Sequence, residues 1–325
     1  MNTFIKYLQS RPYFELMNVI KALCAINSFF LFLGFFGRWV WFFDNIQNFL
    51  IHQLTLACLF FFVFLFRSIS WSCFSLSIIL IASVYVFHRY TPSLQIDNEN
   101  TGPTYKILSF NVLTSNIEHK KFIEFVNDIN PDFILLLEVD KQWMNAVEPI
   151  KKLYSSSVER VRPDNFGIAF LSKYPISTSR IISFGDYDIP STIANLKFDE
   201  KKLTIIGTHT LPPISKTYWS DRNRHLIALK KKMDEYDDQG LIAAGDLNVT
   251  PWSEHGSQFS GKGGYLNIYD MLFNPSWPSK FYPFGIPIDF IMYNSYVEKV
   301  NYRVGNDLGS DHLPVILEFK LKKLE

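Results

Sequence analysis

The pattern of hydrophobic and polar positions divides the chain into two regions. The sequence before residue 90 contains three apolar stretches that are nearly free of charge: residues 22–37, 45–66 and 68–87. A helix needs about 20 apolar residues to span a bilayer, a length that the second and third stretches reach and the first reaches only if it extends back to Val19. A signal peptide would explain one such stretch and not three in succession. We therefore predict a bundle of about three transmembrane helices within residues 1–90.

From Tyr105 onward, short apolar runs alternate with amphipathic stretches. The runs are rich in β-branched and aromatic residues and are bounded by Gly, Pro, Asp or Asn, which is typical of strands. They cover residues 105–110, 132–137, 167–171, 192–198, 203–207, 241–244, 290–293 and 314–319. Helical spacing of apolar residues predicts helices over 118–129 and 222–236. Many strands with few helices favour an α/β fold of two packed sheets with helices outside.

A polar segment separates the two regions. Residues 91–104 (TPSLQIDNENTGPT) contain turn-forming residues and no periodicity, so we interpret them as a linker. The predicted organisation is a membrane anchor over 1–90, a linker over 91–104 and a single domain over 105–325.

Charge and cysteine usage refine this division. Residues 90–325 carry 26 basic and 29 acidic side chains, a net charge of −3, which gives no broad attraction for polyanions such as nucleic acids. All three cysteines (Cys24, Cys58 and Cys73) lie in the apolar region. The C-terminal domain therefore gains no disulfides and needs no reducing compartment.

Basic residues near the ends of the apolar stretches predict the orientation of the chain. Four of them, Lys6, Arg11, Lys21 and Arg67, lie on one side of the predicted spans, whereas Arg38 and Arg89 lie on the other. This asymmetry favours a cytoplasmic N-terminus. Three spans then place the C-terminal domain outside the cytoplasm.

Polar residues interrupt or end the apolar runs of the C-terminal domain. They are Asn111, Glu138, His209, Asp246, Asn248, Asp289, Asp311 and His312. Each one alone is better explained as a turn, cap or packing residue. Together they supply four carboxylates, two carboxamides and two imidazoles, which is the inventory for metal-assisted attack of water on a phosphoester. Mg2+ or Mn2+ would take oxygen ligands and neutralise charge, and a carboxylate or imidazole would move protons.

The order of the motifs resembles that of the endonuclease/exonuclease/phosphatase superfamily. The motifs are NVLTSN at 111–116, LLLEVD at 135–140, FGIAFLSKYPI at 166–176, GTHT at 207–210, AAGDLNVTP at 243–251, PIDFIMYN at 287–294 and GSDHLPV at 309–315. A GDxN tetrapeptide alone would be a weak signal, but its combination with PIDxI and a terminal SDH is specific. The resemblance implies a four-layer α/β sandwich and covers about 105–320.

The resemblance also implies a role for each motif residue. Asn111, Glu138 and Asp311 match metal-site residues, with Glu138 as the principal ligand. Asp246 matches the aspartate that activates the attacking water, Asn248 an amide that places the phosphate, and His209 a phosphate-contacting histidine. His312 matches an acid/base histidine, and Asp289 matches the aspartate that holds it. Asn165 is a further candidate for contact with substrate.

Two further stretches, HTLPP at 209–213 and SDRNRHL at 220–226, resemble a bacterial subgroup in which membrane spans precede the hydrolase domain. One branch of that subgroup is associated with glycopeptide resistance and lipid-pyrophosphate substrates, which implies a multi-pass protein of the inner membrane. Arg222 and Arg224 either clamp a substrate phosphate, since Arg suits bidentate contacts, or occupy an exposed helix start.

Three functions remain open on the sequence alone. The first is a membrane-anchored phosphoesterase acting on a lipid-linked or other extracytoplasmic phosphoester. The second is a membrane-anchored nuclease, since the same catalytic set cleaves nucleic acid in the superfamily. The third is a membrane scaffold with a decayed hydrolase fold, which the presence of every motif residue argues against. The oligomeric state is not specified by the sequence.

Overall fold

The computed structural model describes residues 11–88, 101–198, 201–260 and 264–322. These residues form two compact units, one mainly from the chain up to Arg89 and the other mainly from the chain after it. Most of the predicted linker lies outside the described residues. The domain bounds given above therefore stay a prediction, and each unit is considered by itself.

The first unit consists of helices α2 (Arg11–Gly34), α3 (Trp41–Gln47), α4 (Leu50–Phe64) and α5 (Ile69–His88). Two of its segments, Tyr13–Gly34 and Ile69–Val86, are each long and apolar enough to cross a membrane. The first helix begins earlier than the apolar stretch suggests, because Lys21 and Glu15 do not interrupt it. The predicted second span is broken, since α3 and α4 meet at an angle of 58° and could cross a membrane only as a bent pair.

Large apolar side chains are exposed on these helices. Phe29 in α2, Leu59 in α4 and Leu80 in α5 are 58%, 57% and 57% exposed. Many other large apolar side chains of these helices are exposed too. Exposed apolar side chains in this number are uncommon on soluble proteins and are typical of surfaces that contact a membrane or a partner. Two helices, or three with the bent pair, thus have the length and composition for a bilayer.

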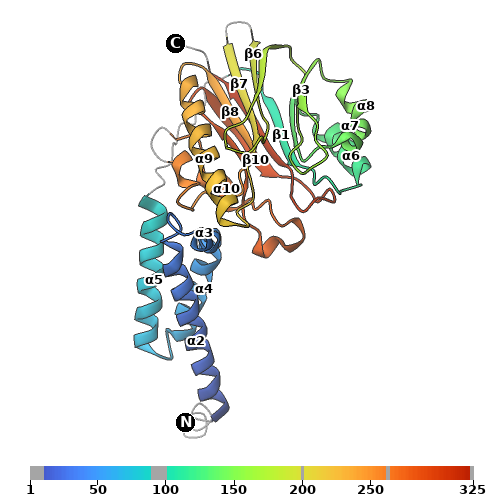
Figure 1. Cartoon of the computed structure of the whole chain (residues 1–325). Helices are drawn as coiled ribbons and strands as arrows, with labels where there is room; N and C mark the ends of the chain where they lie inside the picture. Colours follow the sequence, from blue (N-terminus) through green and yellow to red (C-terminus); the bar gives the residue numbers. More distant parts are fainter. Residues whose placement is uncertain (1–10, 89–100, 199–200, 261–263, 323–325) are drawn as a thin grey trace. The chain divides into compact units, whose positions relative to one another are not determined.

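The second unit contains two mixed sheets (Figure 1). The six-stranded sheet has the order β10 (Val297–Val304), β11 (Val315–Leu321), β1 (Tyr105–Asn111), β2 (Phe133–Leu137), β4 (Ile168–Ser172) and β3 (Ser156–Arg160). The five-stranded sheet has the order β5 (Ile176–Ile182), β6 (Ser191–Phe198), β7 (Lys201–His209), β8 (Gly240–Asp246) and β9 (Asp289–Tyr293). The pairs β1–β2 and β7–β8 are parallel, and the other pairs are antiparallel.

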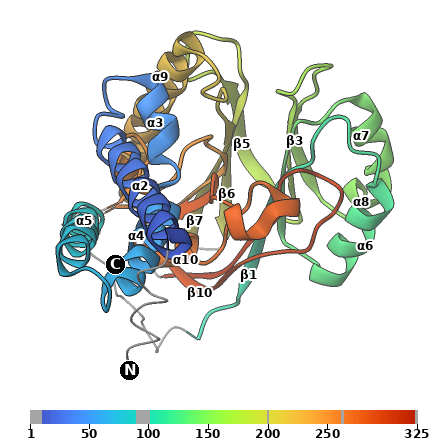
Figure 2. The ribbon, with the colours of Figure 1, turned by 90° about the horizontal axis from the view of Figure 1, so that it is seen from below.

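Helices flank the two sheets (Figure 2). Helices α6 (His119–Ile129), α7 (Lys141–Ala146) and α8 (Glu148–Lys151) pack on the six-stranded sheet. Helix α9 (Lys216–Met233) packs on the five-stranded sheet, and α10 (Ile268–Leu272) lies in the long connection before β9. In α6 the buried residues Phe122, Val126 and Ile129 are three or four positions apart and so share one face. The predicted arrangement of packed sheets flanked by helices is confirmed.

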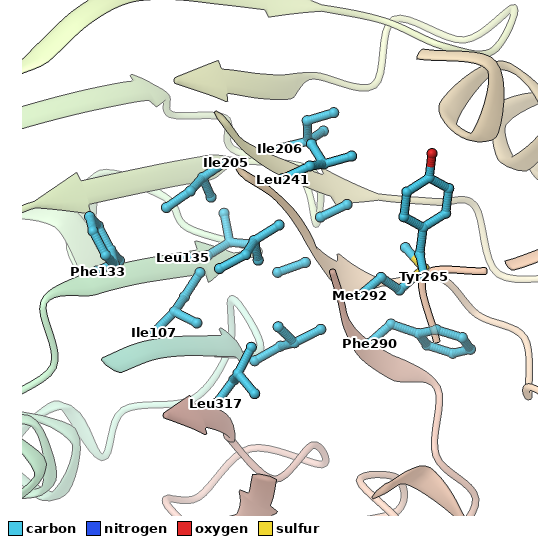
Figure 3. Close-up of a cluster of buried hydrophobic side chains, with 14 of the residues drawn as sticks. Ile107, Phe133, Leu135, Ile205, Ile206, Leu241, Tyr265, Phe290, Met292 and Leu317 are labelled. Carbon is cyan, nitrogen blue, oxygen red and sulfur yellow. The ribbon is translucent and has the colours of Figure 1, made fainter. Parts of the chain in front are cut away.

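The main core lies between the sheets (Figure 3). Ile107, Phe133 and Leu135 point inward from the six-stranded sheet. Ile205 and its cross-strand partner Ile242 line this layer from the other sheet. All five are fully buried. Burial of a Leu, Ile or Phe side chain stabilises a fold by about 1.5–3 kcal/mol, so this layer holds the two sheets in register.

The eight predicted strands are all present, with ends shifted by at most two residues. Three observed strands, β3, β5 and β10, were not predicted. Each of them lies at the edge of a sheet. Strand β5 shows why, because five of its seven residues are exposed and carry little apolar signal. Edge strands bury one flank only, and polar side chains protect their open edge from pairing with other chains.

The sheets approach each other closely at Gly207 in β7. A Cβ atom at this position would lie 2.4 Å from Leu135 Cδ1 on β2 and 2.7 Å from Thr192 Oγ1 on β6. A side chain here would push apart the two sheets two residues before His209.

We expect Gly207→Ala to lower the free energy of unfolding by about 1–3 kcal/mol through overpacking. Chemical or thermal unfolding of the purified chain measures this loss. In a Leu135→Ala background the clashing methyl group is absent, so the added cost of Gly207→Ala should shrink. Strictly additive losses would show that the clash is relieved elsewhere.

Candidate active site

The strand register brings three predicted residues together at one end of the five-stranded sheet. Asp246, at the end of β8, lies directly opposite His209 on β7 and Asp289 on β9. Asn111 ends β1 in the other sheet, where it pairs with Leu137, and Glu138 follows directly after β2. Residues from both sheets therefore meet at one rim, as the carboxyl ends of parallel strands do.

The Asp246 carboxylate occupies the centre of this cluster. Its Oδ2 atom lies 3.2 Å from Asn111 Nδ2, 3.4 Å from His209 Nε2 and 3.6 Å from His312 Nε2. Its Oδ1 atom accepts a hydrogen bond from the backbone N–H of Asn248 at 2.9 Å. Burial alone would raise the pKa of Asp246, but His312 and His209 hold it below the usual value. Asp246 is thus a buried carboxylate that stays ionised.

His312 is held by a second buried carboxylate. Its Nδ1 atom lies 2.8 Å from Asp289 Oδ2, and the backbone N–H groups of Ile288 and Asp289 donate to Ser276 Oγ. Burial would lower the pKa of His312, but Asp289 and Asp246 outweigh it and raise the pKa to about 10. The imidazole is therefore a cation at neutral pH, with Nε2 directed at Asp246. His209 also has a raised pKa, because Asp246 and Glu138 outweigh its burial.

Left-handed backbone conformations occur at two of the site residues. Glu138 has φ 63° and Asn248 has φ 49°. A glutamate rarely adopts positive φ, and such conformations persist where the surrounding structure fixes them. Gly245, directly before Asp246, has φ 145°, and a Cβ there would lie 1.7 Å from Thr208 O. These turns direct the side chains at the rim toward one another.

Glu138 has the features of a ligand for a divalent cation. It is 8% exposed, and its Oε1 atom accepts a hydrogen bond from Asn111 Nδ2 at 2.9 Å. Its Oε2 atom is buried without a hydrogen-bond partner among the described residues. Burial raises the pKa of Glu138 despite the opposing effects of His209 and Asn111. A hard divalent cation would bind this oxygen and compensate the charge of the desolvated carboxylate. The residues present at this position therefore fit a divalent metal ion.

Asp246, Asp289 and His312 also place ligand atoms within 4.8 Å of one another. This trio is less suited to a cation than Glu138, because His312 Nδ1 and Asp289 Oδ2 already engage each other at 2.8 Å and the Asn248 N–H occupies Asp246 Oδ1. Asp311, the remaining predicted metal residue, is exposed, and its Oδ2 atom accepts a hydrogen bond from Trp277 Nε1 at 3.1 Å. The assignment of Asn111, Glu138 and Asp311 to the metal stays a prediction.

The residues predicted to contact substrate differ in their burial and in their hydrogen-bond partners. Asn165 is exposed in the turn before β4, next to Phe166, whose ring centroid is 5.2 Å from that of His209. Arg222 is fully buried in α9 and donates to Asn248 O. Arg224 pairs with Asp186 at 2.6 Å and Asp221 at 3.3 Å on the outer side of α9. These positions favour Asn165 over the two arginines as a substrate contact.

Some supporting residues were not anticipated from the sequence. Ser310 donates to Asn111 O at 2.8 Å, and its Oγ atom accepts the backbone N–H of His312 at 3.1 Å, so it joins β1 to the SDH turn. Trp277 anchors Asp311. Ser310 belongs to the GSDH motif and could have been found there, whereas Trp277 stands in a segment with no recognisable pattern.

A scan against protein families matches residues 108–312 to the Endonuclease/Exonuclease/phosphatase family. The chain belongs to this family. Enzymes of the family are metal-dependent phosphoesterases and nucleases, so the predicted enzyme class is confirmed, while the identity of the ion and the subgroup with membrane spans are not established. No curated protein sequence matches the chain.

Solved structures show the same fold at low identity. The TDP2 structure from D. rerio, described as complexed with a single-strand DNA product, is 18% identical with TM-score 0.57, covering 67% of this chain and 99% of that one. The human Nocturnin catalytic domain with bound sulfate is 18% identical with TM-score 0.56, covering 68% and 96%. An endonuclease/exonuclease/phosphatase from Bacteroides vulgatus is 16% identical with TM-score 0.57, covering 68% and 100%. All three align with about two thirds of the chain.

We expect Mg2+ or Mn2+ to raise the unfolding temperature of the wild-type chain and to have no such effect on Glu138→Gln. A ligand that binds only the folded state stabilises it by mass action, and the amide removes the principal ligand charge. In EDTA the Gln variant should be at least as stable as wild type, because it lacks a desolvated carboxylate. Glu148→Gln, on an exposed residue, is the control. A full metal-induced shift in Glu138→Gln would place the ion elsewhere.

Proposed function

We propose that this chain is a membrane-anchored, divalent-metal-dependent hydrolase of lipid-linked or other extracytoplasmic phosphoesters. The observation that supports it best is the Asp246 carboxylate, buried and ionised, with two imidazoles and a carboxamide within 3.6 Å of its Oδ2 atom. A group in that state can accept a proton from water, and the nearby cation His312 can meet negative charge that develops on a phosphoryl group.

The residues of the site divide the chemistry among themselves. Asp246 orients the attacking water and takes its proton. His312, oriented by Asp289 at 2.8 Å, donates a hydrogen bond to a phosphoryl oxygen or a proton to the leaving group. Asn248 donates one N–H of its side chain to Thr210 O at 3.0 Å, and an amide NH2 has a second N–H for a phosphate oxygen. A divalent cation held by Glu138, Asn111 and Asp311 would supply Lewis acidity and neutralise phosphate charge.

The proposed substrate class rests on the N-terminal helices and on charge. Helices of sufficient length and apolarity precede the catalytic unit in the same chain, so a bilayer would keep that unit near membrane lipids. The net charge of −3 after residue 89 gives the unit no general attraction for nucleic acid. A phosphoester whose apolar part stays in the bilayer satisfies both conditions.

The second candidate is a membrane-anchored nuclease. The same catalytic residues suit both reactions, and the D. rerio TDP2 structure of the same fold is described as complexed with a single-strand DNA product. Its fold is shared with this chain, but identity of 18% carries no information on substrate. Nucleic acid would require a groove with basic residues and aromatic residues for stacking.

The first test compares two substrates of the full-length chain in detergent. We expect phosphate release from a polyprenyl pyrophosphate that depends on Mg2+ and stops in EDTA, and no cleavage of plasmid DNA. DNA cleavage that stops in EDTA would establish the nuclease instead. Asp246→Asn should lower turnover by at least about 1000-fold while the variant stays folded, because an amide cannot accept the proton. Asp238→Asn, an exposed residue with the same change in charge, is the matched control.

The proposed orientation has its own test. A phosphatase reporter that is active only outside the cytoplasm, fused after Glu325, should be active in cells. Its counterpart that is active only in the cytoplasm should not be. The reverse pattern would place the hydrolase unit inside the cytoplasm and exclude an extracytoplasmic substrate.

A further inference from the structure

Helix α9 contains an arginine that is completely buried. Arg222 is 0% exposed and ranks among the largest fully buried side chains of the described chain. A buried guanidinium costs free energy unless its donors are satisfied, so its partners indicate why the fold contains it. The hydrogen bonds of Arg222 connect it to the loop that contains Asn248, next to Asp246.

The guanidinium is held at a fixed angle by its chain neighbour. Its Nε and Nη2 atoms both donate to Asn223 Oδ1, at 3.0 and 2.6 Å. The Asn223 side chain is fixed in turn by His255, whose Nε2 atom is 3.0 Å from Asn223 Nδ2. This leaves Nη1 aimed at the loop after β8, where it donates to Asn248 O at 2.8 Å.

Asn248 transmits this contact to Asp246. Its backbone is left-handed, with φ 49°, and its N–H orients the Asp246 carboxylate through Oδ1 at 2.9 Å. Its side chain donates to Thr210 O beside His209. A charged donor on the carbonyl of Asn248 therefore stabilises the one loop conformation in which Asp246 Oδ2 faces His209 and His312.

We propose that Arg222 is a positioning residue of this site, which fixes the Asn248 loop and through it the Asp246 carboxylate. The inference rests on the proposed hydrolysis for its effect on rate. It differs from both roles that the sequence left open, a phosphate clamp and an exposed helix start, because the guanidinium is fully buried and already bonded to Asn223 and Asn248. Helix α9 fixes the neighbouring strand as well, through His225 Nε2 at 2.7 Å from Thr208 Oγ1.

The kinetic test uses Arg222→Met and Arg222→Lys in the full-length chain, with polyprenyl pyrophosphate and Mg2+. We expect Arg222→Met to lower kcat by about 10- to 100-fold, the range for loss of a charged hydrogen bond, with KM changed by less than about 3-fold. Arg222→Lys should recover part of kcat, since it keeps one charged donor. Lys231→Met removes an exposed charge from the same helix and should leave both constants unchanged. A higher KM at constant kcat would overturn the proposal in favour of direct phosphate binding.

A second variant tests the proposal even if Arg222→Met does not fold. Asn223→Ala keeps the guanidinium and removes the oxygen that accepts two of its N–H groups. It should lower kcat in the same direction and by less. Unchanged kcat in both Asn223→Ala and Arg222→Lys would show that the loop holds its conformation without the arginine, which contradicts the proposal.

Hydrogen exchange tests the same contact without any substrate. The backbone amide hydrogen of Asn248, which is bonded to Asp246, should exchange at least about 10-fold faster in Arg222→Lys or Asn223→Ala than in wild type. Its exchange rate in Lys231→Met should equal that of wild type. Equal protection in all variants would refute the positioning role. If the wild-type chain hydrolyses no phosphoester, the proposed function fails, while this exchange measurement still decides whether Arg222 fixes the loop.

Discussion

The catalytic unit depends on keeping one carboxylate ionised although it is buried in the protein. Asp246 is 2% exposed, and an isolated charge at such a position would cost several kcal/mol or would take up a proton. Two imidazoles, a carboxamide and a backbone N–H surround it and offset that cost. Asp289 in turn holds His312, and Glu138 accepts a hydrogen bond from Asn111, so the requirement spreads outward into both sheets.

The sheet register meets this requirement. His209, Asp246 and Asp289 are direct neighbours on β7, β8 and β9, and a slip of one residue on any of these strands would turn its functional side chain to the other face. The inter-sheet layer around Leu135 and Ile205 then fixes Asn111 and Glu138 against that trio. The geometry of the active site therefore depends on the packing of the core between the sheets, because neither sheet contains the site alone.

The sequence predicts the buried central strands of the two sheets better than the exposed strands at their edges. Strand β2 consists of buried apolar residues alone, and the polar Glu138 that follows it stands out as functional. The edge strands β3, β5 and β10 lack that contrast and escape prediction, whereas β9, which is also at an edge, is mostly buried and was predicted. Arg222 shows a different limit. Its residue type suits phosphate, but only three-dimensional burial shows that it faces Asn248 and not the solvent. Positive φ at Glu138 is likewise invisible in the sequence.

The distribution of cysteine has a practical consequence. Cys24, Cys58 and Cys73 all lie in the N-terminal apolar region, and the hydrolase unit has no thiol at all. Oxidants and alkylating reagents that act on thiols therefore have no target in this unit. Replacement of three residues would give a chain without cysteine. Single cysteines introduced on β5 or α9 would then carry spectroscopic labels that report the motion of the catalytic unit without interference from native thiols.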